Sequence, residues 1–251
     1  MTNRFRTIAA LGAIAALTLT GCATGSDDAG TDGAGTGAET VTIEHALGTA
    51  EIPADVERVV TLGWGSTEAV LALGVVPVGI SYQSYGANAD GIEPWVVDEL
   101  EALGGETTVL PNSTETPIEA IAELEPDLIL ATYSGVTEDE YALLDAIAPT
   151  VAYPETEWST PWQEVITTAG TALQQEDEAD AVIDGIADEL ATVAEEHPQF
   201  AGKKAIFLQA PYYEGNAIAY QAGLSTDFLT DLGFVVPPEI EGRGVGTKLI
   251  R

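Results

Sequence analysis

Cysteine, histidine and basic residues are scarce in this chain, and each scarcity excludes a class of protein. One cysteine among 251 residues excludes a disulfide within the chain. Two histidines, His45 and His197, are too few for the imidazole-rich site expected of a zinc or manganese receptor. The 8 Lys and Arg face 41 Asp and Glu, which gives a formal net charge of −33. A surface this negative repels nucleic acid and anionic lipid, so we expect no nucleic-acid partner.

The few basic residues are also unevenly distributed. Between Val59 and Gly202 there is no lysine or arginine. The simplest explanation is solubility in a salty or acidic habitat. The functional interpretation is that the ligand is not strongly anionic, because this part of the fold offers it no cation.

The one cysteine, Cys22, ends the sequence Leu19-Thr20-Gly21-Cys22 and follows a short apolar run at 8–19. That run is too short to cross ~30 Å of hydrocarbon as a helix, and two arginines precede it. The pattern predicts a lipoprotein signal peptide over 1–21 and lipidation of Cys22, with the mature chain anchored to the extracytoplasmic face of the membrane. An ordinary secretory peptide with an incidental cysteine is the alternative. Residues 22–40 contain no large apolar residue and predict a flexible tether.

Short β-branched runs alternate with helical patterns from residue 41 to 158. The predicted strands are 41–45, 58–62, 75–80, 127–131 and 149–151, and the predicted helices are 67–73, 95–103, 118–124 and 137–147. This alternation predicts an α/β lobe with a mainly parallel sheet covered by helices on both faces. Ligands of such sheets bind beyond the carboxyl ends of the strands.

The rest of the chain predicts a helical connector over 159–197 and a second α/β lobe over 198–251. Two apolar stripes at helical spacing indicate a short helix and then a long one at 177–196, about 30 Å in length. Strands at 204–209 and 217–220 and a helix at 226–232 follow. The predicted fold is therefore two Rossmann-like lobes with parallel sheets joined by a long helix, the second lobe being incomplete.

Four segments carry a resemblance to a known family, namely 58–62, 67–79, 118–130 and 228–234. In their order and spacing the chain resembles the iron–siderophore and cobalamin substrate-binding proteins of ABC importers, of the class with a rigid helical connection between lobes. The resemblance implies a non-enzymatic monomer without a cofactor, which binds a ferric siderophore in a cleft between the lobes. It also implies docking on arginines of the ABC permease subunits through Glu119. An ordinary acid favoured by the helix dipole is the alternative for Glu119.

The resemblance fails at the end of the chain. The family continues after Gly246-Thr247-Lys248 with a Ser-x-Glu-x-Leu helix, whereas this sequence ends in Leu249-Ile250-Arg251. The second docking carboxylate therefore has no counterpart here, and we expect the chain to be incomplete at its C-terminus.

Aromatic and hydroxyl side chains in the loops that leave the strands are the candidate ligand contacts, because a chelate needs apolar surface and a few hydrogen-bond donors. Packing in the core is the alternative for each aromatic. Trp158 and Trp162 are expected to pack the connection to the long helix, with Trp158 also within reach of the cleft. The predicted contacts are Trp64, Ser66, Tyr82, Tyr85, Tyr133, Ser134, Tyr212, Tyr213 and Arg243.

Charge favours one class of siderophore. A triply anionic ferric catecholate would face a lobe without cations, whereas a hydroxamate-like complex would not, so the latter is preferred. Haem bound through Tyr133 or Tyr85, cobalamin, and a surface lipoprotein without a transport role are the alternatives. No enzyme is expected, because Gly63-Trp64-Gly65-Ser66-Thr67 does not have the Gly-x-Ser-x-Gly spacing of a nucleophile elbow.

Overall fold

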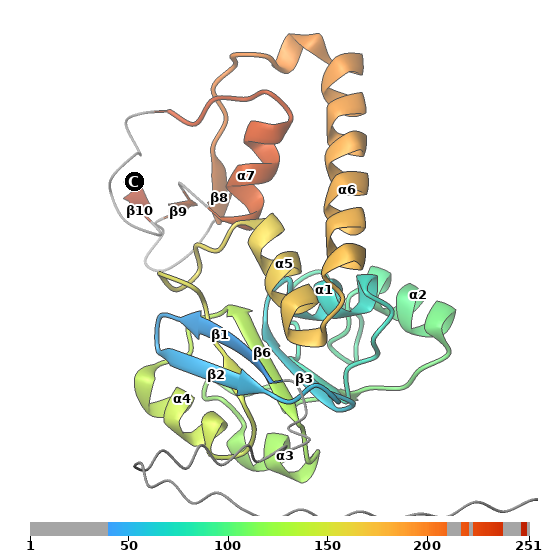
Figure 1. Ribbon diagram of the computed structural model, residues 1–251. Coiled ribbons are helices and arrows are strands. Elements are labelled where there is room, and N and C mark those ends of the chain that lie inside the picture. The colour runs from blue at the N-terminus through green and yellow to red at the C-terminus, as the bar shows by residue number, and fades with distance from the viewer. Residues whose placement is uncertain (1–39, 210–216, 221–222, 238–246, 250–251) are drawn as a thin grey trace, which may run out of the picture. The chain divides into compact units, whose positions relative to one another are not determined.

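The computed structural model describes residues 40–209, 217–220, 223–237 and 247–249 (Figure 1). The predictions for the signal peptide, for Cys22, for the tether up to residue 39 and for Tyr212, Tyr213 and Arg243 lie outside the described residues. Among the helices that are described, none combines the length and the apolar character needed to cross a membrane.

A five-stranded parallel sheet forms the centre of the first α/β lobe, as the sequence predicts. Its strands are β3 (Val59–Gly63), β4 (Gly79–Ile80), β5 (Thr108–Val109), β6 (Leu128–Tyr133) and β7 (Thr150–Val151), in the order β5-β4-β3-β6-β7. From β3 the chain builds outward through β4 and β5, and it then returns to the other side of β3 to form β6 and β7. The strand order therefore reverses between β3 and β6, which is the topological switch point of the sheet.

Helices cover both faces of this sheet. On one face α1 (Ser66–Ala72) and α5 (Trp162–Leu173) pack over Val59, Leu128 and Leu130. On the other face α3 (Ile118–Glu123) and α4 (Glu138–Asp145) pack over the alternate strand residues, which include Val60 and Ile129. Helix α2 (Pro94–Leu103) packs beside α1 through Val96 and Leu100.

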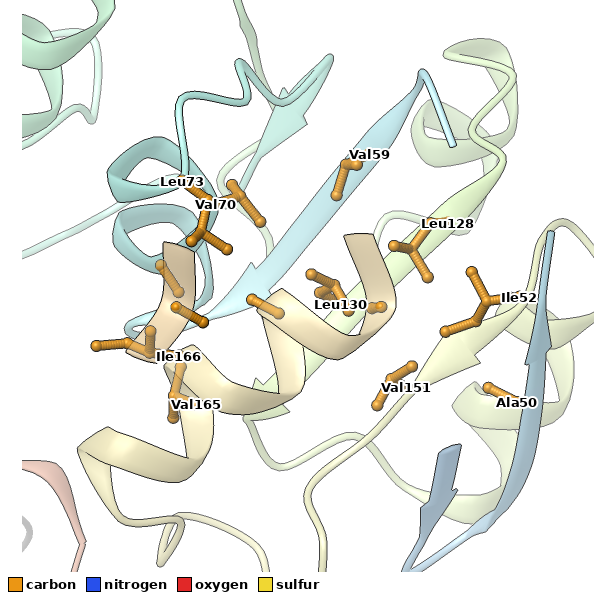
Figure 2. Close-up of a cluster of buried hydrophobic side chains, with 14 of the residues drawn as sticks. Ala50, Ile52, Val59, Val70, Leu73, Leu128, Leu130, Val151, Val165 and Ile166 are labelled. Atoms are coloured by element: carbon orange, nitrogen blue, oxygen red, sulfur yellow. The ribbon is translucent and has the colours of Figure 1, made fainter. Parts of the chain in front are cut away.

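Figure 2 shows the buried side chains of the first of these interfaces, which include Val165 and Ile166 of α5 and Leu128 and Leu130 of β6. Leu128 and Leu130 are 0% exposed, as expected for strands covered on both faces. Each such side chain contributes about 1.5–3 kcal/mol to folding relative to its exposed state. The core is therefore formed by the strands that end at the switch point, and it fixes their positions.

Two local differences from the sequence prediction have clear causes. Strand β1 (Val41–His45) forms as predicted, but it pairs antiparallel with β2 (Gly48–Ile52), which the sequence did not indicate because Gly, Ala and Glu disfavour strands. Of the strand expected over 75–80, only Gly79 and Ile80 pair in the sheet. The Val75 N–H instead donates to the Val70 carbonyl at the end of α1, and Pro77 has no N–H to donate.

The predicted helical connector is present as α5 followed by α6 (Glu176–Glu196) and by a 3₁₀ turn, η1 (Pro198–Phe200). Helix α6 has 21 residues, so it extends over about 30 Å. Gln174 separates α5 from α6 in a left-handed conformation with φ of 55°. The long helix therefore begins one residue before the predicted start at 177 and ends at 196 as predicted.

The described strands of the second lobe do not form the parallel sheet that was predicted. Strands β8 (Phe207–Gln209), β9 (Ala217–Tyr220) and β10 (Thr247–Leu249) pair antiparallel in the order β10-β9-β8, and α7 (Leu224–Asp231) follows β9. Only residues 210–216 connect β8 to β9, and a parallel crossover needs about a dozen residues or more. The spacing therefore favours a hairpin for β8 and β9, whereas Lys204, at the start of the predicted strand 204–209, forms a parallel bridge with Val235.

Candidate functional site

A cavity of about 290 Å³ opens at the carboxyl ends of the parallel strands. Gly63 ends β3, and Ser81, Leu110 and Ser134 directly follow β4, β5 and β6; all four line the cavity. This strand-end cavity therefore includes the switch point between β3 and β6, where open α/β sheets bind ligands. The structure confirms that the strand-exit loops converge, which the sequence analysis inferred from topology.

An irregularity in the pairing of β3 with β6 shapes the edge of this cavity. Thr61 pairs with Leu130, but Gly63 pairs with Tyr133, so β6 contains one extra residue at this point. The Trp64 N–H then donates to the Tyr133 carbonyl at 3.0 Å. Gly63 has φ of 79°, and a Cβ there would lie 2.2 Å from the Tyr133 carbonyl oxygen. Only glycine fits this bulge, which positions the loop that begins at Trp64.

Trp64, Tyr133 and Trp158 form an aromatic cluster beside the cavity. The Trp64 ring is stacked on Tyr133 with centroids 6.5 Å apart, and Trp158 lies 5.9 Å from Trp64 and 5.8 Å from Tyr133. Trp158 lines the cavity. Trp64 is 41% exposed and Tyr133 only 4%, so Trp64 retains free ring surface while Tyr133 supports the other two rings.

Trp158 reaches the cavity through an unusual backbone conformation. Its φ is 56°, which is rare for a bulky residue, and its N–H donates to the Ser134 carbonyl at 3.3 Å. The indole packs directly on Gly135, where a Cβ would lie 2.5 Å from the indole Nε1. The sequence predicted that Trp158 mainly packs the connection to the long helix and also lies within reach of the cleft. In the structure Trp158 lines the strand-end cavity and also packs against the core cluster that includes α5.

The two predicted serine contacts are both buried and hydrogen-bonded internally. Ser66 Oγ lies 2.9 Å from Thr132 Oγ1, and the structure does not bring Ser66 to the strand-end cavity. Ser134 lines the cavity, but its hydroxyl donates to the Ala131 carbonyl at 2.7 Å. The hydroxyls of Ser66 and Ser134 therefore stabilise the segments that follow β3 and β6.

The two predicted tyrosines of the next loop differ in position. Tyr82 lines the cavity, and its ring packs on Gly91, where a Cβ would lie 2.2 Å from the ring. The Gln83 N–H donates to the Gly91 carbonyl at 2.9 Å and closes this loop behind Tyr82. Tyr85 is 74% exposed and does not line the cavity.

A polar segment that the sequence analysis did not select forms one wall of the cavity. We call residues 110–117 the polar wall, because Asn112, Ser113, Thr114, Glu115 and Thr116 all line the cavity. The wall was missed because the strand before it, β5, has two residues and carries no readable alternation. The run Pro-Asn-Ser-Thr was the available signal, since it indicates a loop between a strand and a helix.

The charged groups of the cavity are all acidic. Glu115 and Glu140 line it, and its lining contains no lysine or arginine among the residues that the structure describes. In those same parts of the chain, no group of three or more His, Cys, Asp or Glu side chains is placed to hold a metal ion. A cavity whose charged lining residues are acidic suits a ligand that carries little negative charge.

Two further predicted or candidate features lie away from this cavity. Glu119 lies in the first turn of α3 and is exposed. An apolar groove of about 300 Å³ lies among helices α1, α5, α6 and α7, and its lining includes Trp162 and Phe228. Trp162 Nε1 also donates to Asp231 Oδ2 at 2.9 Å, so this tryptophan links α5 to α7, whereas the sequence predicted that it packs the connection to the long helix.

Comparisons with known proteins agree with this geometry. A family model described as periplasmic binding protein matches residues 59–244. The probable siderophore-binding lipoprotein YfiY of Bacillus subtilis is 37% identical over 147 residues, which are 58% of this chain and 42% of YfiY. The chain also matches 53% of the length of the Fe(3+)-citrate-binding protein YfmC of the same organism, at 28% identity. The chain thus spans about half or less of the length of these curated relatives.

The similarity to solved structures extends over a larger share of both chains than the similarity to YfiY. Streptococcus pneumoniae PiaA in complex with ferrichrome has a TM-score of 0.77 and 33% identity, over 83% of this chain and 73% of PiaA. Staphylococcus aureus SirA complexed with staphyloferrin B has a TM-score of 0.67 and 26% identity, over 84% of this chain and 70% of SirA.

Proposed function

Because the chain belongs to the periplasmic binding protein family, we propose that it captures a ferric siderophore outside the cell and delivers it to an ABC importer. The family resemblance inferred from the sequence is confirmed, and with it the expectation of a binding protein instead of an enzyme. The observation that carries the proposal is the strand-end cavity, which joins an aromatic cluster to a polar wall at the switch point. The similarity to PiaA in complex with ferrichrome and to SirA in complex with staphyloferrin B supports it.

The preferred ligand is a neutral or cationic, hydroxamate-like complex. Glu115 and Glu140 are the charged residues of the cavity, so an anionic ligand would be repelled. Two like unit charges about 8 Å apart repel by roughly 2 kcal/mol at an effective dielectric constant near 20. A triply anionic catecholate complex would be subject to several such repulsions, whereas a neutral complex would be subject to none.

Binding would use ring surface and hydrogen bonds in place of positive charge. The Trp158 indole offers an apolar face to the organic part of the chelate, and Trp64 supports it. The Asn112 amide and the Ser113 and Thr114 hydroxyls are exposed hydrogen-bonding groups in the same lining.

The proposal includes the partners inferred from the sequence. A monomer would be held at the extracytoplasmic face of the membrane by lipid on Cys22. Glu119 would dock on an arginine of an ABC permease subunit, and its exposure in the first turn of α3 supports this role. The relatives' names support the lipid anchor, because YfiY is named a lipoprotein.

The test is a titration of the purified protein with ferrichrome and with a ferric tris-catecholate, followed by calorimetry. We expect ferrichrome to bind more tightly than the catecholate, and Trp158→Ala to weaken ferrichrome binding by roughly 30-fold or more, as for a buried aromatic anchor. Trp95→Ala is the matched control, since Trp95 is 56% exposed and does not line the cavity. A wild-type protein that binds no ferric complex would refute the proposal.

A further inference from the structure

One carboxylate, that of Glu140, connects two separate segments of the chain. Its Oε1 accepts hydrogen bonds from the Thr116 N–H at 3.3 Å and from the Thr116 hydroxyl at 2.6 Å. Its Oε2 accepts from the Thr137 N–H at 3.0 Å and from the Thr137 hydroxyl at 2.8 Å. Thr137 Oγ1 accepts in turn from the Glu140 N–H at 3.3 Å, which completes a capping box at the start of α4.

The Thr116 side of this arrangement belongs to the polar wall of the cavity. At its start the wall is held by the Leu110 N–H, which donates to the Ile80 carbonyl at 2.8 Å. Between Pro111 and Glu115 the residues are exposed. Among the described residues, Glu140 supplies the only side chain from outside the wall that hydrogen-bonds to residues 111–117. The far end of the wall therefore depends on this carboxylate for its attachment to α4.

The electrostatics of Glu140 agree with such a role. Burial acts to raise the pKa of Glu140, but hydrogen bonds from Thr116 and Thr137 outweigh it, and the pKa lies below its usual value. The carboxylate is therefore charged at neutral pH, and its two oxygens accept from all four donors. Hydrogen bonds to a charged acceptor are also stronger than those between neutral groups.

We propose that Glu140 is a positioning residue for ligand binding, which holds the polar wall in place through Thr116 so that the ligand meets pre-ordered hydrogen-bonding groups. This inference rests on the proposed function, since it takes the strand-end cavity as the ligand site. A wall that is already ordered loses less conformational entropy when the ligand binds, so affinity increases without new contacts. The capping of α4 uses the other carboxylate oxygen, so the two roles of Glu140 are experimentally separable.

A double-mutant cycle with ferrichrome as the probe separates the role of Glu140 in holding the polar wall from its role in capping α4. Thr116→Val removes the hydroxyl on the wall side, and Glu140→Ala removes the whole connection. We expect each to weaken ferrichrome binding by roughly tenfold, and the double variant to be no weaker than Glu140→Ala alone. Thr137→Ala should lower the melting temperature but keep the ferrichrome affinity within about twofold, because it removes only the capping side.

Glu101→Ala is the matched control, since it removes an exposed carboxylate of α2 that does not line the cavity. It should leave the ferrichrome affinity unchanged. Fully additive losses for Thr116→Val and Glu140→Ala would overturn the inference, because the two groups would then act independently. Equal loss of affinity in Thr137→Ala would also overturn it, by assigning the whole effect to the helix cap.

A measurement without ligand distinguishes failure of this inference from failure of the proposed function. Backbone order parameters of residues 112–116 should fall from near 0.85 toward about 0.6 in ligand-free Glu140→Ala, while those of α1 stay unchanged. If the wild type binds no ferrichrome, the proposed function fails, and the order parameters alone decide whether Glu140 positions the wall. If they do not change in Glu140→Ala, the inference is wrong.

Discussion

Replacing Gly135 with alanine should displace the Trp158 indole from the strand-end cavity. The added Cβ would lie 2.5, 2.8 and 2.9 Å from three indole atoms, closer than such contacts occur in folded proteins. Gly135 is not among the residues with positive φ, so the substitution adds a methyl group without backbone strain. The indole therefore has to move, and it must leave its contacts with Tyr133 and Trp64.

The expected magnitudes follow from this overlap. Forcing an extra methyl group into a packed site costs about 1–3 kcal/mol, which lowers the melting temperature of a chain of this size by about 3–9 °C. The Trp158 ring would no longer present its face to the ligand, so the ferrichrome affinity should fall by roughly tenfold or more. Because Trp158 also contacts a second tryptophan, the tryptophan emission of the free protein should change.

Gly185→Ala provides the matched control. Gly185 lies within α6, is exposed, and an added Cβ there meets no atom within 4 Å. This variant should gain about 0.5–1 kcal/mol from helix propensity and bind ferrichrome like the wild type. Thermal unfolding, emission spectra and ferrichrome titration of both variants make the comparison. If Gly135→Ala kept the wild-type emission and affinity, the assignment of Trp158 to the ligand site would be refuted.

Three further predictions concern single side chains. Trp64→Ala should weaken ferrichrome binding several-fold with little loss of melting temperature, because the ring is 41% exposed; equal binding by titration would contradict its role. Burial lowers the pKa of His45, outweighing the opposing effects of the Thr150 backbone and the Asp145 charge. The imidazole therefore takes up a proton more readily in the unfolded state than in the folded state, so stability is lost as pH falls below about 6.5. His45→Gln should reduce this loss, as measured by urea unfolding at pH 7.5 and 5.5. The same pH dependence in His45→Gln and wild type would contradict this role of His45. Glu119→Ala should leave ferrichrome affinity unchanged and lower iron uptake through the importer, whereas normal uptake would exclude docking at this residue.

The elements that the sequence predicted well are those with a strong hydrophobic pattern. The β-branched runs of β3 and β6 and the stripes of α5 and α6 were all recognised, since burial on one or both faces imposes these patterns. Strands β2 and β5 were missed, because Gly48–Ile52 is poor in strand-forming residues and β5 has two residues. The antiparallel pairing of β8 with β9 depended on a connection length that was available from the sequence.

The part of the site that follows from sheet topology could be predicted from the sequence, whereas the part that depends on local backbone conformation could not. Topology alone brought Tyr82 and Ser134 to the cavity and Trp64 and Tyr133 to its edge, because their loops leave neighbouring parallel strands. The position of Trp158 depends on a left-handed conformation and on the missing Cβ of a glycine, which no periodicity reveals. The partner of a buried hydroxyl is likewise hidden in the sequence, as the Ser66 contact with Thr132 shows, since 66 residues separate them.

A crystal structure of this protein grown with ferrichrome would show where the ligand binds. We expect the chelate in the strand-end cavity, with the Trp158 indole against its organic part and the polar wall within hydrogen-bonding distance. Ferrichrome seated in the apolar groove of α1, α5, α6 and α7, or an empty strand-end cavity at saturating ferrichrome, would contradict this expectation.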